Sequence, residues 1–164
     1  MTPGNAQPNA DIFDFKRRNL KDLARLSRDY FAELNPFDRT LQFADNWDER
    51  YRKLMAMGIG SDRFFIRGVR SDKEIIGFIM FGYRVESLWK IANRGYISNI
   101  YVIPEHRRKG VGILMVRDAV ETLLAAGSKV IELEVYTLNR PGRAFWSHLG
   151  FGDFKNRLRL IPPA

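Results

Sequence analysis

Residues 99–112 read N-I-Y-V-I-P-E-H-R-R-K-G-V-G, and this stretch decides the fold. Its first part is rich in β-branched and aromatic residues, which favours a strand that ends at Pro104. Its second part carries three basic residues and the glycines Gly110 and Gly112, before a segment of helical character. A strand, a glycine turn and a helix start leave backbone N–H groups free at the positive end of the helix dipole. The stretch therefore predicts a site for an anion such as a phosphate.

The spacing of the glycines differs from two common phosphate-binding motifs. A dinucleotide site would need G-x-G-x-x-G and a nucleotide P-loop would need G-x-x-x-x-G-K-[ST], and this stretch has neither. The pattern present is R-x-x-G-x-G, formed by Arg107, Gly110 and Gly112. By itself it also fits an ordinary strand-to-helix turn with solvated arginines, so the surrounding sequence has to decide.

Hydrophobic periodicity around this stretch predicts an α/β chain. Helices are expected at residues 20–34, 45–57, 110–126 and 141–149. Strands are expected at residues 12–15, 64–69, 74–85, 97–103, 130–136 and 157–161. The strand before residue 104, the helix from residue 110 and the strand from residue 130 form a right-handed crossover, so these two strands should be parallel. Gly77 and Gly82 predict a bulge or a close backbone approach inside their strand.

Length and composition set the class of protein. The 164 residues are 45% hydrophobic, which predicts one domain over residues 12–164 after a disordered leader over residues 1–11. No apolar run approaches the ~18 residues that a membrane span needs. There is no cysteine, and His106 and His148 lack metal-ligand spacing, so we expect a cytoplasmic protein without a metal. The net charge of +8 is spread along the chain, which disfavours nucleic acid as the direct partner.

A second motif lies downstream, at residues 132–151, and reads E-L-E-V-Y-T-L-N-R-P-G-R-A-F-W-S-H-L-G-F. Together the two motifs resemble the GNAT family of N-acetyltransferases. The family segment L-x-V-x-x-x-N-x-x-x-x-A-x-x-Y-x-x-x-G-F is matched at Asn139, Ala144, Gly150 and Phe151. The resemblance implies a GNAT-type mixed sheet of about six to seven strands flanked by about four helices, with a splayed central parallel pair.

The same resemblance implies an acetyl-CoA-dependent N-acetyltransferase. In the family the amine attacks the thioester carbonyl directly in a ternary complex, so the lack of a cysteine nucleophile is no obstacle. The residues implied to bind the coenzyme are Ile100, Tyr101 and Val102 on the strand, Arg107, Arg108, Lys109, Gly110, Val111 and Gly112 in the loop, and Asn139 near the last helix. The alternative is a catalytically degenerate member that binds acyl-CoA as a sensor or partner module.

Three residues are the catalytic candidates: Glu134, Tyr96 and Tyr136. Glu134 matches a glutamate that some relatives use as the base, although it also fits an exposed strand residue; Tyr96 is the second candidate for the base. In the family a tyrosine often serves as the general acid, and its position corresponds here to Trp146. The indole N–H of tryptophan cannot usefully donate a proton. Tyr136, Tyr96 or water could supply the acid, or none is needed, because a thiolate with a pKa of ~8.5 leaves readily. Trp146 is then a packing residue.

The acceptor site is implied to lie at the loop between the first two helices. The sequence F-A-E-L-N-P-F-D-R-T-L-Q-F-A-D-N-W at residues 31–47 mixes aromatic rings with carboxylates. Such a surface suits a cationic amine through cation–π and Coulombic attraction, but it also fits core aromatics and acids at helix starts. Aminoglycosides, polyamines, protein N-termini and lysines all stay open as acceptors, and so does a homodimer.

Overall fold

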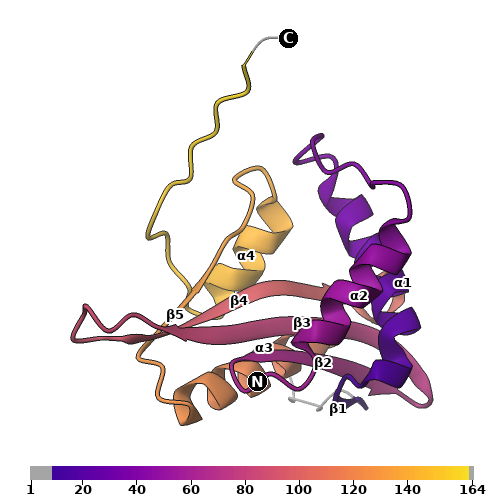
Figure 1. The fold of residues 1–164 in the computed structure, drawn as a ribbon, viewed down its shortest axis with the longest axis horizontal. Helices are drawn as coiled ribbons and strands as arrows, with labels where there is room; N and C mark the ends of the chain where they lie inside the picture. Colours follow the sequence, from indigo (N-terminus) through magenta and orange to yellow (C-terminus); the bar gives the residue numbers. More distant parts are fainter. Residues whose placement is uncertain (1–8, 163–164) are drawn as a thin grey trace, which may run out of the picture. The chain divides into compact units, whose positions relative to one another are not determined.

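The computed structural model describes residues 9–162 of the chain, in two units, Met1–Glu134 and Val135–Ala164. The first unit contains a single sheet with the strand order β1-β2-β3-β4-β5 (Figure 1). Its strands are β1 (Asp11–Asp14), β2 (Phe64–Ser71), β3 (Glu74–Val85), β4 (Asn93–Val102) and β5 (Val130–Leu133). The second unit contains α4 (Arg140–His148). Residues 1–8 of the expected leader lie outside the described residues.

The strands up to β4 pair antiparallel with their neighbours, and only β4 and β5 are parallel. The connection between these two is α3 (Val111–Ala125), so the predicted crossover is confirmed. Their pairing runs from Arg94 opposite Val130 to Ile97 opposite Leu133, while β4 continues to Val102. The pair therefore separates halfway along β4, as expected of two strands that splay apart.

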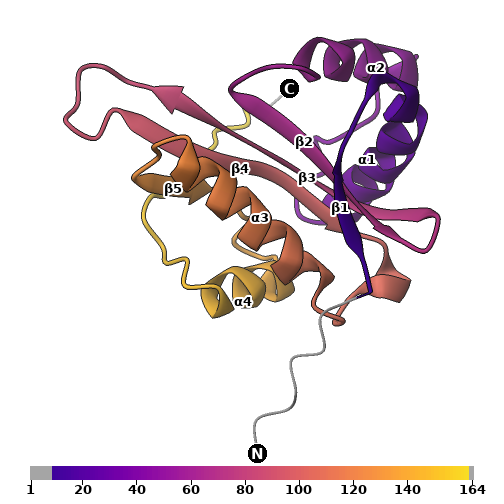
Figure 2. The ribbon, with the colours of Figure 1, turned by 90° about the horizontal axis from the view of Figure 1, so that it is seen from below.

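Helices cover both faces of the sheet in the first unit. The amphipathic α1 (Leu20–Leu34) and α2 (Trp47–Gly58) lie on one face and α3 on the other (Figures 1 and 2). On the α1 face, Leu23 and Leu26 belong to one buried cluster with Phe78 and Tyr101. This cluster fixes the last turn of α1 near the end of β4, which matters for the site below.

The C-terminal end of α3, at Ala125, agrees with the helix expected up to residue 126, and a glycine explains it. Gly127 has φ +88°, a left-handed conformation that glycine adopts without a steric penalty. Ser128 N donates to Leu123 O at 2.9 Å and Gly127 N donates to Leu124 O at 2.9 Å. These two bonds form a Schellman motif, which stops the helix and turns the chain toward β5.

The strand predictions differ from the structure in three respects. The sheet has five strands among the described residues, and the expected six to seven are not present. Residues 157–161 form no strand, and Leu158 and Leu160 are exposed, because a strand-forming pattern produces a strand only where a partner satisfies its backbone groups. The strand expected over residues 130–136 ends at Leu133.

Among residues 9–162, no helix has the length and apolar character that crossing a membrane requires.

Gly77 lies where the backbones of β3 and β4 pass close to each other. A Cβ atom at this position would collide with the carbonyl oxygen of Tyr101 and lie 3.1 Å from Cγ1 of Val69. Gly82 meets the backbone in the same way, at the carbonyl oxygen of Arg63. A register shift between Val69 and Arg70 lies opposite this region. The sequence prediction of a bulge and of close backbone approach is therefore confirmed.

We expect Gly77→Ala to destabilise the protein by about 1–3 kcal/mol, the usual cost of overpacking a tight site. The reason is that the colliding atom belongs to the backbone of β4 and cannot rotate away. Denaturant unfolding measures the change. Gly152→Ala is the control, since a Cβ at Gly152 meets nothing within 4 Å. Equal stability of the two variants would mean that β3 and β4 move apart without cost.

Candidate functional site

Among residues 9–162, β5 pairs with β4 only as far as Ile97, so the end of β4 has no partner strand on that side. Ile103 N donates to Ile76 O at 2.9 Å. In an antiparallel pair every second residue bonds its neighbour strand, so Tyr101 also turns its backbone groups toward β3. Ile100 and Val102 therefore turn their backbone groups away from β3, toward the edge where β5 has already ended. This segment, with Tyr101, is the predicted binding strand for the pantetheine arm. The N–H and C=O groups of Ile100 and the N–H group of Val102 can bond an extended amide-containing ligand, whereas the Val102 carbonyl accepts a hydrogen bond from Arg107.

The loop after β4 leads into α3 through two residues with positive φ. Arg108 has φ +60°, which is uncommon for a residue with a side chain, and Gly110 has φ +82°. Left-handed residues within such a loop form concave arrangements of backbone N–H groups that bind anions. The basic side chains of Arg107, Arg108 and Lys109 are exposed around it. The six predicted residues, from Arg107 to Gly112, thus lie together after β4 and the short 3-10 helix Pro104–His106, and they run into the first turn of α3.

The first turn of α3 has no side-chain cap. Gly110 is its N-cap residue and cannot supply one, and the first helical bond runs from Leu114 N to Gly110 O at 3.0 Å. The N–H groups of Val111 and Gly112 precede that bond and lack acceptors inside the helix. Together with the helix dipole they favour a bound phosphate.

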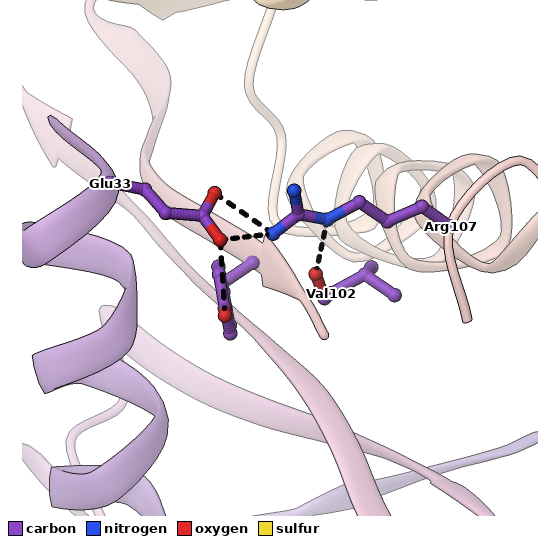
Figure 3. Close-up of polar contacts among 4 residues, drawn as sticks. Glu33, Val102 and Arg107 are labelled. Atoms are coloured by element: carbon purple, nitrogen blue, oxygen red, sulfur yellow. Dashed lines mark hydrogen bonds and ion pairs between the residues drawn. The ribbon is translucent and has the colours of Figure 1, made fainter. Parts of the chain in front are cut away.

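Arg107 joins the loop to α1 (Figure 3). Its Nη2 donates to both carboxylate oxygens of Glu33, at 2.7 and 2.9 Å, and its Nε donates to the carbonyl oxygen of Val102 at 2.7 Å. The guanidinium carbon lies 5.3 Å from the ring centroid of Tyr101, whose hydroxyl donates to Glu33 Oε1 at 3.4 Å. Arg107 therefore holds a carboxylate of α1 at the end of β4.

Tyr101 is a neutral phenol at physiological pH. Burial, together with the negative charges of Glu33 and Asp29, raises the pKa of Tyr101 to about 12. Burial likewise raises the pKa of Tyr30, which packs against the Tyr101 ring at 6.2 Å between centroids. Neither phenol can serve as a base near neutral pH, and the Tyr101 hydroxyl acts as a hydrogen-bond donor.

The catalytic candidates of the first unit lie on the parallel pair. Tyr96 is opposite Glu132 in the register of β4 and β5, and Glu134 follows two residues after Glu132, past the end of β5. Glu132 accepts from Arg94 Nη2 at 2.6 Å, so its carboxylate is paired. Tyr96 is half-buried beneath Arg84, whose guanidinium lies 5.3 Å from its ring centroid, whereas Glu134 is exposed. Their roles stay predictions.

The remaining predicted residues belong to the second unit. Asn139 is the N-cap of α4, and its Oδ1 accepts from Gly142 N at 3.0 Å. Its Nδ2 is therefore the group left for a ligand. Tyr136 lies in the segment before α4, and its carbonyl shapes the turn there by accepting from Asn139 N at 2.9 Å. Trp146 is buried, with the rings of Phe145 and Phe151 at 5.0 and 5.3 Å.

The predicted acceptor loop is partly occupied by the protein's own groups. Arg28 lies over Phe43 and Trp47, 4.6 and 5.1 Å from their centroids, and bonds Asp48 at 2.6 Å. Asp38 is buried and accepts from the backbone N and the hydroxyl of Thr40. The aromatic rings therefore already hold a cation, and Asp38 stabilises a turn.

Sequence reasoning missed Arg28 and the role of Glu33. Glu33 was counted only as one acid of the acceptor loop, and its partner Arg107 is 74 residues away. No local pattern connects the two, since an ion pair between distant residues depends on how α1 packs on the sheet. The helical spacing of α1, which places Glu33 in the turn after Tyr30, is the one signal that bears on its position.

Comparisons with known proteins agree with this geometry. A family model described as "Acetyltransferase (GNAT) family" matches residues 20–151. An uncharacterized N-acetyltransferase of Methanocaldococcus jannaschii is 27% identical over 153 residues, and the match spans 92% of this chain but 65% of that protein's length. The thialysine N-epsilon-acetyltransferase of Mus musculus is 24% identical over 151 residues, 87% of this chain and 84% of that one. A solved structure of the aminoglycoside N-acetyltransferase AAC(6')-Iy with CoA has a TM-score of 0.75 at 14% identity, over 100% of both chains.

Proposed function

Because the chain belongs to the GNAT acetyltransferase family, we propose that it transfers an acetyl group from acetyl-CoA to a primary amine by direct attack in a ternary complex. The observation that carries this proposal is the uncapped start of α3 behind the basic loop, at the end of a strand with a free edge. Such a site suits a ligand with a diphosphate at one end and an amide-containing arm at the other. Coenzyme A has both features.

The residues present fit the coenzyme in a simple arrangement. The diphosphate is assigned to the loop from Arg107 to Gly112, where backbone N–H groups and basic side chains meet. The pantetheine arm is assigned to the free edge at Ile100 and Val102. Asn139 lies in the second unit, and its binding to the coenzyme stays a prediction. The described residues contain no group of three or more metal-ligating side chains, and the proposed reaction draws on none.

In the proposed reaction the amine nitrogen forms a bond to the thioester carbonyl carbon, and the carbon–sulfur bond breaks. Glu134 is the proposed base that takes the proton from the attacking amine, with Tyr96 as its alternative. A backbone N–H at the free edge of β4 can stabilise the developing oxyanion. The departing thiolate takes a proton from water or from Tyr136, or leaves without one.

The acceptor is proposed to be a small molecule or a peptide with a cationic amine. Two similar proteins are named as acetyltransferases of such amines, one of thialysine and one of aminoglycosides. Carboxylates of α1, Asp29 and Glu33, face the end of β4 closely enough to act on Tyr101, which suits a positive charge there. The cytoplasmic location and a homodimer stay predictions.

Release of thiol from acetyl-CoA across an amine panel tests the function. The panel consists of an aminoglycoside, a polyamine, lysine and a peptide with a free N-terminus. We expect turnover with at least one amine and binding of coenzyme A by calorimetry. Binding without turnover would instead support a coenzyme-binding sensor, and absence of binding would contradict both.

We expect Trp146→Tyr, which restores the family's residue, to change kcat less than tenfold. A thiolate that leaves near its own pKa gains little from an acid, and tenfold in rate corresponds to about 1.4 kcal/mol. Trp146→Phe is the control for packing: it should cost about 1 kcal/mol of stability without a change in rate, because the indole is buried between two rings. A gain of a hundredfold in Trp146→Tyr would mean that acid catalysis limits the native protein.

A further inference from the structure

The guanidinium of Arg107 has two partners in this structure, and both bear on the proposed coenzyme site. One is the Glu33 carboxylate, bonded at 2.7 and 2.9 Å, and the other is the Val102 carbonyl, bonded at 2.7 Å (Figure 3). Arg107 is also the first residue of the R-x-x-G-x-G motif assigned to the diphosphate. The same side chain therefore serves a carboxylate on α1 and belongs to the loop that receives a phosphate.

The ion pair is placed where it can open. The side chains of Arg107 and Glu33 are 39% and 46% exposed, and exposed pairs of this kind contribute little to stability. A diphosphate offers two anionic oxygens side by side. The planar guanidinium of arginine can donate two parallel hydrogen bonds to such a pair. The free N–H groups at the start of α3 hold that diphosphate in place at the same time. The phosphate is therefore a stronger partner for Arg107 than Glu33 is.

Glu33 keeps a defined position when Arg107 leaves. It lies in the last turn of α1, which packs through Leu23 and Leu26 on the sheet. The Tyr101 hydroxyl still donates to it, since the raised pKa keeps that phenol protonated. Loss of the guanidinium thus leaves a held carboxylate beside the end of β4. Such a group suits the ammonium of an incoming amine.

We propose that Arg107 is shared between Glu33 and the coenzyme: the diphosphate takes the guanidinium, and the Glu33 carboxylate is thereby freed to bind the acceptor ammonium. The proposal rests on the proposed function. It makes Glu33 a competitor for the coenzyme in the free protein and a binding group for the amine in the ternary complex. A structural ion pair, in contrast, would position Arg107 and would help the coenzyme to bind.

The affinity of Glu33→Gln for coenzyme A separates these two roles by its sign. We expect calorimetry to show a two- to fivefold tighter Kd, because Arg107 no longer has to leave a carboxylate. Asp29→Asn is the matched control: it removes another acid of α1 that acts on Tyr101 but has no bond to Arg107 in the described structure. An unchanged or weaker Kd in Glu33→Gln, or equal tightening in Asp29→Asn, would overturn the proposal.

The second half concerns the amine and uses the substrate found by the thiol-release panel. We expect Glu33→Gln to raise the KM for this amine about five- to twentyfold, since the variant loses the contact with the ammonium. The kcat should be nearly unchanged, because the proposed base Glu134 is intact. An unchanged KM would overturn the role of Glu33 at the acceptor. Failure of the wild-type protein to bind coenzyme A would contradict the proposed function. If the wild type binds coenzyme A but Glu33→Gln does not bind it more tightly, only the sharing of Arg107 would be contradicted.

Discussion

We expect the substitution Gly110→Asp to abolish the binding of coenzyme A. Gly110 is the N-cap of α3. The carboxylate of an aspartate at this position would lie beside the same N–H groups that are assigned to the diphosphate. An aspartate at an N-cap accepts hydrogen bonds from the first turn, so it would occupy the site itself and repel a phosphate. Two lost bonds to a charged ligand, at about 1.5–3 kcal/mol each, weaken binding by roughly 10²–10⁴-fold.

The fold should survive this change. The left-handed φ of +82° disfavours a side chain, but capping of the helix offsets part of that strain. Gly60→Asp is the matched control, because Gly60 has φ +90° and open space around it. It introduces the same residue at the same kind of conformation, away from the loop.

Calorimetry with coenzyme A and thermal melting of both variants decide the matter. We expect both to stay folded, with binding lost only in Gly110→Asp. If Gly110→Asp bound coenzyme A as the wild type does, the loop would be an ordinary turn, and the assignment of the diphosphate to α3 would be wrong.

The second large effect is expected from Glu134→Gln. Removal of a general base lowers turnover by about 10²–10⁴-fold, while glutamine keeps the shape of the side chain. The Kd for coenzyme A should stay within a few-fold, because Glu134 follows β5 and is no part of the phosphate loop. A kcat measurement with the amine from the panel, together with calorimetry, gives both numbers.

Glu132→Gln is the matched control for this base. Glu132 lies two residues earlier and its carboxylate is paired with Arg94 at 2.6 Å, so it should be unable to accept the proton. We expect a much smaller loss of kcat in this variant, accompanied by lower stability. A loss below tenfold in Glu134→Gln would transfer the role to Tyr96, which Tyr96→Phe then tests, or to bulk water.

Several features of this protein could be predicted from the sequence because their causes are local. Gly127 ends α3 since glycine alone adopts its left-handed φ freely, and the two bonds that follow need only neighbouring residues. The βαβ unit around α3 follows from alternating and helical periodicity in adjacent segments, and its handedness from the twist of strands. The anion-binding loop, which stays a prediction, rests on the same kind of local evidence, because its strand, glycines and basic residues are contiguous.

Other features depend on partners that are distant in the chain. Residues 157–161 have the composition of a strand but form none, since their backbone groups require a neighbouring strand that no local pattern can supply. Asp38 stabilises a turn and Arg28 lies over an aromatic pair, whereas Glu33 on α1 pairs with Arg107 at the end of β4.

The sequence by itself thus determined the crossover, the helix start and the family resemblance, all of which arise within one continuous segment. The tertiary structure alone decided what Arg107 contacts. Its ion pair with Glu33 spans 74 residues and exists because the buried cluster of Leu23, Leu26, Phe78 and Tyr101 brings α1 against β4. The packing of apolar side chains brings the two charged residues together, and the order of charges along the chain does not predict this contact.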